Sequence, residues 1–219
     1  MKTKSVVIFL LACLILIACA NTNRGEKKRF EGKLVYQITS ARRDLSSEDS
    51  TSFQVIYAKD SLVRTDNFTQ LGKQTYIKHI VKNRAYTLLN FAGNKMAIQS
   101  IPDSSKNIEG KYQFDYKRKK KKFLDRKAKL VKVKNKEVEQ EFDVYYFDEI
   151  SHDYSNAIPG IDGLPVQYSL FVNGEKLTYT LISIESKTID KDYFGLPSDY
   201  TVITPEEFSK FISPEEDAE

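Results

Sequence analysis

The chain has few of the residues that build thiol and metal chemistry. It contains two cysteines and two histidines in 219 residues. Cys13 lies inside an apolar N-terminal run and is expected to be removed with it, so Cys19 would remain as the only cysteine and no disulfide could form. His79 and His152 lie 73 positions apart without an obvious set of carboxylates around them, and we therefore expect no metal site.

Catalytic motifs are equally scarce. The sequence has no Gly-x-Ser-x-Gly elbow and no glycine-rich phosphate loop. Ser151-His152-Asp153 holds the three residue types of a triad, but neighbouring residues point in different directions, and a working triad is assembled from separate parts of a fold. The acidic pairs Asp148-Glu149 and Glu206-Glu207 are typical of turns and first helical turns, whereas a glycosidase needs two carboxylates at a fixed separation. We expect no catalytic residue, no cofactor and a noncatalytic protein.

Long apolar runs are also rare, and the one that stands out lies at the N-terminus. Residues 6–18 follow Lys2 and Lys4, and the run is too short to cross a bilayer, which takes about 20 apolar residues. It ends in Leu16-Ile17-Ala18-Cys19, which resembles the bacterial lipobox. We expect a signal peptide over residues 1–18 and a mature chain whose first residue, Cys19, carries diacylglycerol. An ordinary signal peptide with a chance cysteine and an uncleaved anchor are the alternatives.

The residues after Cys19 indicate where a lipidated chain would be sorted. Aspartate directly after the lipidated cysteine is a retention signal for the inner membrane, and here Ala20 and Asn21 stand in its place. The acidic stretch that resembles a surface-export signal is absent from residues 21–24. We therefore expect the lipid on Cys19 to anchor the protein in the outer membrane, on the periplasmic face.

Charge is segregated along the chain although the total is small. Without Lys2 and Lys4 the mature chain would have 32 basic and 30 acidic residues, a formal net charge of +2. Lys117 to Lys122 is an unbroken basic run that scattered basic residues continue to Lys136. Such a block is typical of a solvated loop, and contact with anionic lipid headgroups or an envelope protein partner is the alternative. We expect no nucleic-acid partner, despite the electrostatic likeness to a phosphate-binding patch.

From Phe30 onward the dominant pattern is alternation of apolar and polar residues, which predicts half-buried strands. The expected strands cover residues 34–38, 53–57, 76–81, 85–89, 96–101, 129–133, 142–147, 166–172 and 176–184. The three from 76 to 101 are expected to form a meander. Residues 102–122 break the pattern and predict a loop with at most one irregular strand over 112–116.

Three connections carry specific signals. Asn173-Gly174 predicts a tight hairpin turn that requires positive φ angles. Residues 158–165 are rich in helix and strand breakers yet contain three large aliphatic side chains, so we expect this loop to pack inward. Thr204, Pro205 and Glu207 have the spacing of a capping box, which predicts a short helix over residues 205–212.

These elements predict one mainly-β domain over residues 30–213. About ten strands and one short C-terminal helix imply a curved antiparallel sheet, closed as a barrel, left open as an incomplete half-barrel, or folded as a sandwich. A polar, lipidated tether over residues 19–29 would precede the domain. An acidic tail over residues 214–219 would follow it and is expected to be disordered.

Three short motifs carry a family resemblance. Phe30–Tyr36 opens the domain, Ile158–Pro165 precedes the long hairpin, and Asp192–Tyr200 lies near the end. In this order they resemble the motifs of the GLPGLI-type lipoproteins of Bacteroidota, over most of residues 30–212. The resemblance implies a fold similar to that of the Lol-type (LolA/LolB-like) lipoprotein carriers, which is an incomplete antiparallel barrel around an apolar cavity. It favours the half-barrel.

Tyrosine and phenylalanine are abundant, with 13 of each and no tryptophan. Alternating aromatic residues are first of all core formers. In a sheet with too few helices to cover it, some of them would instead line an open groove. The candidate ligand-groove residues are Tyr36, Phe53, Tyr57, Tyr168 and Leu170.

Two functional hypotheses from different classes follow. The first is a membrane-anchored binding module whose concave sheet face accepts a hydrophobic ligand, such as an acyl chain, or a lipidated partner. The second is a structural or accessory subunit of an outer-membrane complex that binds no small ligand. A large apolar cavity would favour the first, and a filled core with an exposed apolar patch would favour the second.

Overall fold

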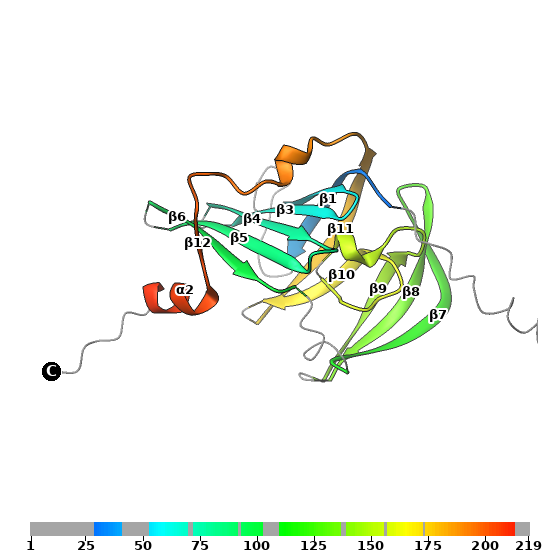
Figure 1. The fold of residues 1–219 in the computed structure, drawn as a ribbon. Coiled ribbons are helices and arrows are strands. Elements are labelled where there is room, and N and C mark those ends of the chain that lie inside the picture. Colours follow the sequence, from blue (N-terminus) through cyan, green and yellow to red (C-terminus); the bar gives the residue numbers. More distant parts are fainter. Residues whose placement is uncertain are drawn as a thin grey trace, which may run out of the picture.

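Twelve strands form one continuous sheet in the part of the chain that the structure describes (Figure 1). The structure is a computed structural model, and the described residues are 29–40, 53–69, 72–91, 93–102, 110–136, 139–155, 157–172 and 174–212. The expected signal peptide, Cys19, nearly all of the tether and the tail over 214–219 lie outside these residues.

The strands are distributed along the whole described chain. The first six are β1 (Gly32–Ser40), β2 (Phe53–Lys59), β3 (Leu62–Thr69), β4 (Gly72–His79), β5 (Arg84–Phe91) and β6 (Asn94–Ser100). The others are β7 (Tyr112–Phe123), β8 (Arg126–Asn135), β9 (Gln140–Phe147), β10 (Leu164–Val172), β11 (Glu175–Ser186) and β12 (Thr201–Ile203). The described residues also contain three helical segments, which are η4 (His152–Tyr154), η5 (Lys191–Phe194) and α2 (Pro205–Ile212).

The strand order is β12-β6-β5-β4-β3-β2-β1-β11-β10-β9-β8-β7. Neighbouring strands are antiparallel except β12, which pairs with β6 in parallel. β7 and β12 remain as edges, so the sheet curls without closing into a barrel. This confirms a mainly-β fold with an open, curved sheet and a short C-terminal helix; the parallel pair was not expected.

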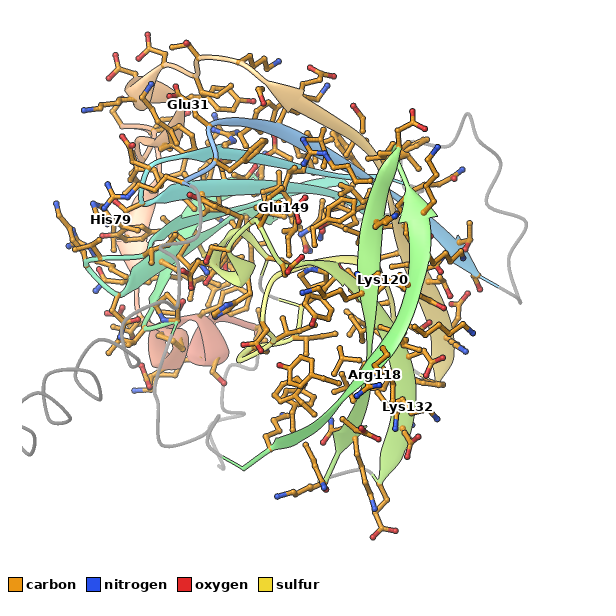
Figure 2. All side chains as sticks on the ribbon, turned by 90° about the vertical axis from the view of Figure 1, so that its right-hand side faces the viewer. Glu31, His79, Arg118, Lys120, Lys132 and Glu149 are labelled. Atoms are coloured by element: carbon orange, nitrogen blue, oxygen red, sulfur yellow. The ribbon has the colours of Figure 1, made fainter. Side chains whose placement is uncertain are left out.

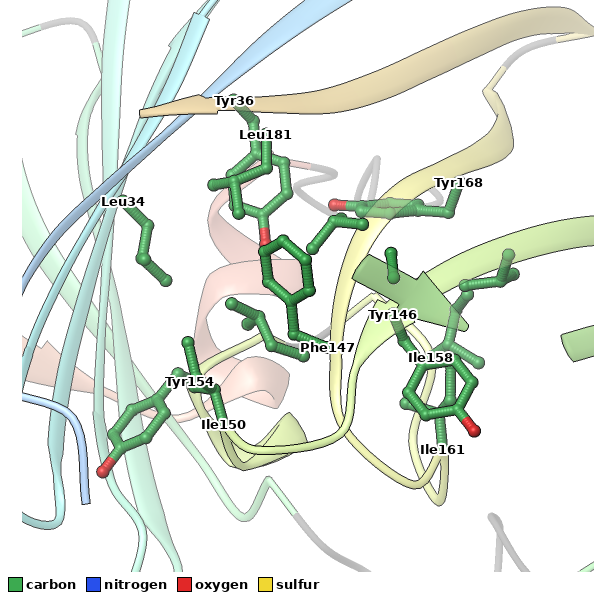
Figure 3. Close-up of a cluster of buried hydrophobic side chains, with 14 of the residues drawn as sticks. Leu34, Tyr36, Tyr146, Phe147, Ile150, Tyr154, Ile158, Ile161, Tyr168 and Leu181 are labelled. Atoms are coloured by element: carbon green, nitrogen blue, oxygen red, sulfur yellow. The ribbon is translucent and has the colours of Figure 1, made fainter. Parts of the chain in front are cut away.

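The segment that connects β9 to β10 fills part of the concave side of the sheet. Ile150, Tyr154, Ile158 and Ile161 from this segment are buried against side chains of β1, β9, β10 and β11 (Figure 3). Residues 158–165 therefore pack inward, as their aliphatic content predicted. Burial of these apolar side chains contributes the main favourable term of the core.

Hydrogen bonds from two tyrosines fix this segment to the rest of the domain. The Tyr154 hydroxyl accepts from the Phe30 amide at 3.0 Å and donates to the Asp60 carbonyl at 3.2 Å. The Tyr36 hydroxyl donates to the Pro165 carbonyl at 2.7 Å. Both groups are buried away from water, where an unpaired hydroxyl would be costly.

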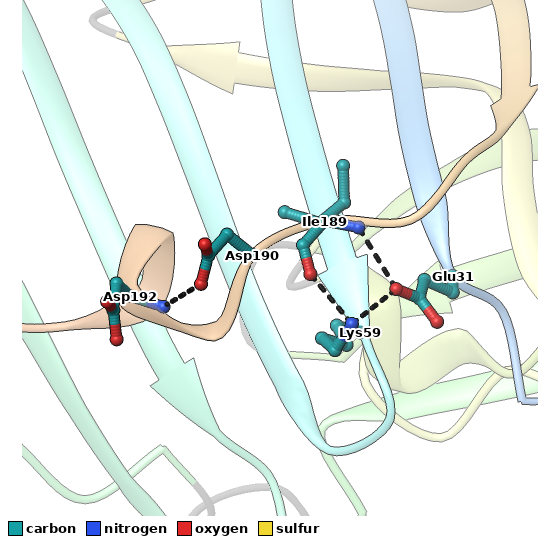
Figure 4. A network of polar contacts seen from close by, with 5 residues as sticks. All are labelled: Glu31, Lys59, Ile189, Asp190 and Asp192. Carbon is teal, nitrogen blue, oxygen red and sulfur yellow. Dashed lines mark hydrogen bonds and ion pairs between the residues drawn. The ribbon is translucent and has the colours of Figure 1, made fainter.

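The segment after β11 covers the outer face of β2 to β5. Figure 4 shows how it is attached: Lys59 Nζ donates to Glu31 Oε1 at 2.6 Å and to the Ile189 carbonyl at 2.7 Å, and the Ile189 amide donates to the same Glu31 oxygen at 3.0 Å. These hydrogen bonds hold the pKa of Glu31 below its usual value. The following turn η5 begins with Asp190, whose carboxylate accepts from the Asp192 amide at 3.0 Å.

The C-terminal helix α2 begins as the capping box predicted. The Thr204 amide donates to Glu207 Oε2 at 2.7 Å, and the Glu207 amide donates to Thr204 Oγ1 at 3.1 Å. Each side chain thus satisfies a backbone donor that the helix leaves without a partner. The apolar face of the helix is largely exposed, with Phe211 45% and Ile212 50% accessible. Within the described part of the chain, no helix has the length and apolar character that crossing a membrane requires.

Two expectations about strands were wrong and one about a turn is confirmed. Residues 112–123 form the twelve-residue strand β7 where a loop was expected, because the basic run lies on an edge strand with its side chains in water. β3 and β12 were not expected at all. Gly174 has a φ of 75°, as the hairpin turn requires, while its neighbour Asn173 lies outside the described residues.

Candidate functional site

A partly enclosed pocket of about 290 Å³ lies on the concave face, between β2–β5 on one side and β10–β11 on the other. We call it the central pocket. It is lined by Gln54, Ile56, Thr65, Asn67, Gln74, Thr75, Tyr76, Thr87, Ser155, Ala157, Tyr168, Leu170 and Tyr179. Its volume lies just below the roughly 300–1,000 Å³ that small-molecule sites occupy, so it suits a small ligand.

One side of the central pocket is aromatic and aliphatic. Tyr168 and Tyr179 are directly paired across β10 and β11, and their rings stack with centroids 5.0 Å apart and planes 3° from parallel. Leu170 follows two residues after Tyr168, hence on the same face. With Ala157 these residues form what we call the aromatic wall. Burial raises the pKa values of the Tyr168 and Tyr179 hydroxyls, so both stay uncharged.

The other side of the central pocket is polar. Strand register places Gln54 opposite Asn67, and Asn67 opposite Gln74, so three amides from β2, β3 and β4 lie in one row across the sheet. Gln54 Nε2 donates to Asn67 Oδ1 at 2.8 Å. In the next row across the sheet, Thr65 of β3, Tyr76 of β4 and Thr87 of β5 contribute hydroxyl groups. The polar wall consists of Gln54, Thr65, Asn67, Gln74, Tyr76 and Thr87.

The structure brings together two of the five candidate groove residues. Tyr168 and Leu170 line the central pocket. Tyr36 is fully buried behind it, with its ring edge-on to Tyr168 at 6.1 Å. Phe53 and Tyr57 lie on the opposite face of β2, because Gln54 and Ile56 occupy the concave face and side chains alternate along a strand.

Tyr57 belongs instead to a contact on the outer face. Its ring meets Tyr193 of η5 at 4.8 Å, and the Arg64 guanidinium lies 4.4 Å from the centre of the Tyr193 ring. Burial, with a hydrogen bond to Tyr193, raises the pKa of Tyr57 to about 12. This cluster attaches the segment after β11 to the outer face of the sheet. Tyr57 therefore does not line the central pocket.

Sequence reasoning missed the polar wall, and it counted Tyr179 among the alternating aromatic residues without choosing it as a candidate groove residue. Asn67 lies on β3, a strand that was not expected, and Gln74 precedes the residues assigned to the expected strand at 76–81. A weak signal was present, since Gln54 and Ile56 alternate with the aromatic residues of β2. Their inward direction depends on the segment after β11 covering the other face, which the local pattern does not show.

Charged side chains lie outside the central pocket. Figure 2 shows Arg118, Lys120 and Lys132 on β7 and β8, and His79 on the far side of the molecule. A second hollow of about 510 Å³ lies against the outer face of β8 to β11, where Lys132 pairs with Glu141 at 2.9 Å. Among the described residues, no group of three or more His, Cys, Asp and Glu side chains could hold a metal ion.

Comparison with known proteins gives a fold likeness and nothing closer. No family profile and no curated protein sequence matches the chain. A solved structure of PNGF-II in space group P21 superposes with a TM-score of 0.54 at 13% identity, over 82% of this chain and 33% of that one. PNGF-II in space group C2 gives a TM-score of 0.47 at 12% identity, over 82% and 32%. This chain thus spans about one third of the proteins that it matches, and at these identities the likeness concerns the fold alone.

Proposed function

We propose that this chain is a noncatalytic binding protein that the lipid on Cys19 anchors in the outer membrane, and that it takes a small ligand into the central pocket. The observation that supports this best is the composition of the pocket, in which the polar wall faces the aromatic wall. Binding pockets combine apolar surface with a few placed polar groups in this way. The resemblance to GLPGLI-type lipoproteins and Lol-type carriers belongs to the same proposal.

The two walls narrow the kind of hydrophobic ligand or lipidated partner that would fit. A bare acyl chain would contact Leu170 and Tyr168. It would leave without a partner the Gln54 carbonyl and the Asn67 NH₂, which the bond between these two side chains does not use, and the Gln74 amide. Each buried amide without a partner costs about 1–3 kcal/mol. The ligand that we propose therefore has an apolar part for the aromatic wall and a hydrogen-bonding head for the polar wall.

Binding of a fluorescent fatty-acid ester, an analogue without charge, tests this proposal. The protein is the chain from residue 19 with Cys19→Ser, and mass spectrometry of its solvent extract identifies any ligand that co-purifies. We expect micromolar binding that Leu170→Asp or Tyr168→Asp abolishes, because a charge in the pocket would need to be desolvated. Ser169→Asp is the matched control, since Ser169 faces the outer side and contacts Thr178.

The outcomes separate binding from folding. All variants are checked for an intact melting transition, and only those that fold are compared. A well-folded parent chain that carries no co-purified ligand and binds no analogue at micromolar concentrations contradicts a ligand-binding function.

The second candidate function is an accessory subunit of an outer-membrane complex. It is favoured by the core that the β9–β10 segment packs into the concave side and by exposed apolar side chains at the C-terminal end, where Val202 is 48%, Phe211 45% and Ile212 50% accessible. A photo-crosslinker in place of Phe211 would then capture one defined envelope protein in cells, and the same crosslinker at Glu206 would not. If both positions give no adduct, the accessory role loses its support.

A further inference from the structure

The aromatic wall offers a flat, apolar surface to the ligand. Tyr168 is only 2% accessible, so the part of this surface that a ligand can reach is the half-buried Tyr179 ring, which stacks parallel to the Tyr168 ring. Stacked rings of this kind are rigid, and they favour contact with another flat surface that carries C–H groups.

The polar wall offers alternating donors and acceptors. The bond from Gln54 to Asn67 uses an N–H of the first amide and the carbonyl of the second. The Gln54 carbonyl and the Asn67 NH₂ therefore keep hydrogen-bonding capacity, and Gln74 adds a further amide in the same row. An amide can serve two adjacent hydroxyl groups at once, one as donor and one as acceptor.

No charged side chain is among the described residues that line the central pocket. On β3 the charged side chains lie on the face away from the pocket. Asp66, between Thr65 and Asn67, points to that face. There it pairs with Arg64 at 3.1 Å and with Lys73 at 2.9 Å. An anionic or cationic ligand would thus lose its hydration in the pocket without gaining an opposite charge, so the pocket suits a neutral ligand.

We propose that the head of the ligand is a single neutral sugar ring. This inference rests on the proposed function and specifies its ligand. A pyranose carries C–H groups on its faces, which match the aromatic wall, and hydroxyl groups around its edge, which match the polar wall. The volume of about 290 Å³ favours one ring over a long oligosaccharide. The ring could belong to a free saccharide or to the head of a glycolipid.

Saturation-transfer NMR with simple glycosides tests the inference. The protein is again the chain from residue 19 with Cys19→Ser. The probes are the methyl β-glycosides of glucose, galactose and N-acetylglucosamine at millimolar concentration, with n-octyl β-D-glucopyranoside below its micellar concentration as a separate arm. We expect at least one methyl glycoside to bind. Tighter binding of the octyl than of the methyl glucoside points to a glycolipid head, and equal binding points to a free saccharide.

Variants locate the binding site on the two walls. Asn67→Leu removes an amide at nearly constant volume, and Tyr179→Leu removes one stacking ring. Each should raise the glycoside Kd about tenfold, the effect of losing one good contact. Gln167→Leu is the control: Gln167 lies on the outer face, where its amide donates to Thr180 Oγ1 at 3.1 Å. It should leave the Kd unchanged.

The two proposals fail in different ways. If none of the glycosides binds while the uncharged fatty-acid ester does, the sugar inference is wrong and the binding function stands. If a glycoside binds equally well to Asn67→Leu and Tyr179→Leu, the central pocket is not its site and the inference is also wrong. If neither glycoside nor analogue binds a folded chain, both proposals are overturned.

Discussion

Gly174 adopts a backbone conformation in the β10–β11 hairpin that most residues disfavour. Its φ of 75° lies in the left-handed region, and an added Cβ would meet no heavy atom within 4 Å. Position 174 therefore requires the left-handed backbone conformation, while the space around it would accommodate a side chain. A β-branched side chain is the least suited to this conformation.

Gly174→Val should lower the melting temperature of the domain. The expected loss is about 1–2 kcal/mol, because a valine in the left-handed conformation carries strain that glycine does not. Thermal unfolding followed by circular dichroism measures it. Gly174→Asn is the control, since asparagine enters this region more readily and should lose less. Equal melting temperatures for Gly174 and Gly174→Val would contradict a strained turn.

At the scale of elements, β7 explains the basic run. Lys117 to Lys122 lie on the last strand of the sheet, whose outer edge has no neighbouring strand among the described residues. An open edge offers unpaired backbone groups to other chains, and a row of basic side chains opposes such pairing through charge repulsion and desolvation. The run thus has a structural role that does not require a partner.

Removing charge from β7 should therefore promote aggregation. We expect Arg118→Val combined with Lys120→Val to increase light scattering on mild heating, because the edge becomes both apolar and β-prone. The matched control is Lys127→Val combined with Lys134→Val, which removes the same charge from β8, a strand paired on both sides. Equal scattering of the two double variants would show that total charge, not the edge, decides solubility.

Predictions from sequence succeeded where the signal is local. The cap of α2 depends on Thr204 and Glu207, three residues apart, and both predicted bonds are present. The meander of β4, β5 and β6 and the facing of Tyr168 follow from alternation alone. β3 was missed because Arg64 and Asp66 interrupt its apolar pattern, and their partners, Tyr193 and Lys73, come from other elements.

The candidate pocket was predicted only in part for the same reason. The β10 side followed from the alternation of Val166, Tyr168 and Leu170. The β2 side was assigned to the wrong face, because Phe53 and Tyr57 are more apolar than Gln54 and burial was expected to follow apolarity. Tyr193 and its neighbours cover that face from more than a hundred positions away along the chain. The alternation of residues within β2 carries no information about a segment that covers one of its faces from so far along the chain.

At the scale of the whole molecule, the proposed lipid anchor would decide where the pocket operates. Cys19→Ser in the full chain should move the protein from the membrane fraction to the soluble fraction, because a thioether-linked diacylglycerol supplies most of the proposed membrane affinity. Fractionation followed by immunoblotting measures this. An unchanged membrane fraction would contradict lipid anchoring at Cys19 and favour an uncleaved apolar N-terminus instead.

The pairing of β1 with β11 sets the order in which the chain can fold. Gly32 lies opposite Ser186 and Ser40 opposite Leu177, so the middle of the sheet joins residues from opposite ends of the domain. Such distant pairing gives a high contact order, which slows folding. Synthesis proceeds from the N-terminus, so β1 has only β2 beside it until β11 has been made. A chain truncated before Glu175 would lack β11, which lies between β1 and β10. It would therefore form two separate half-sheets with β1 and β10 as exposed edges, and these edges would be open to proteolysis and aggregation.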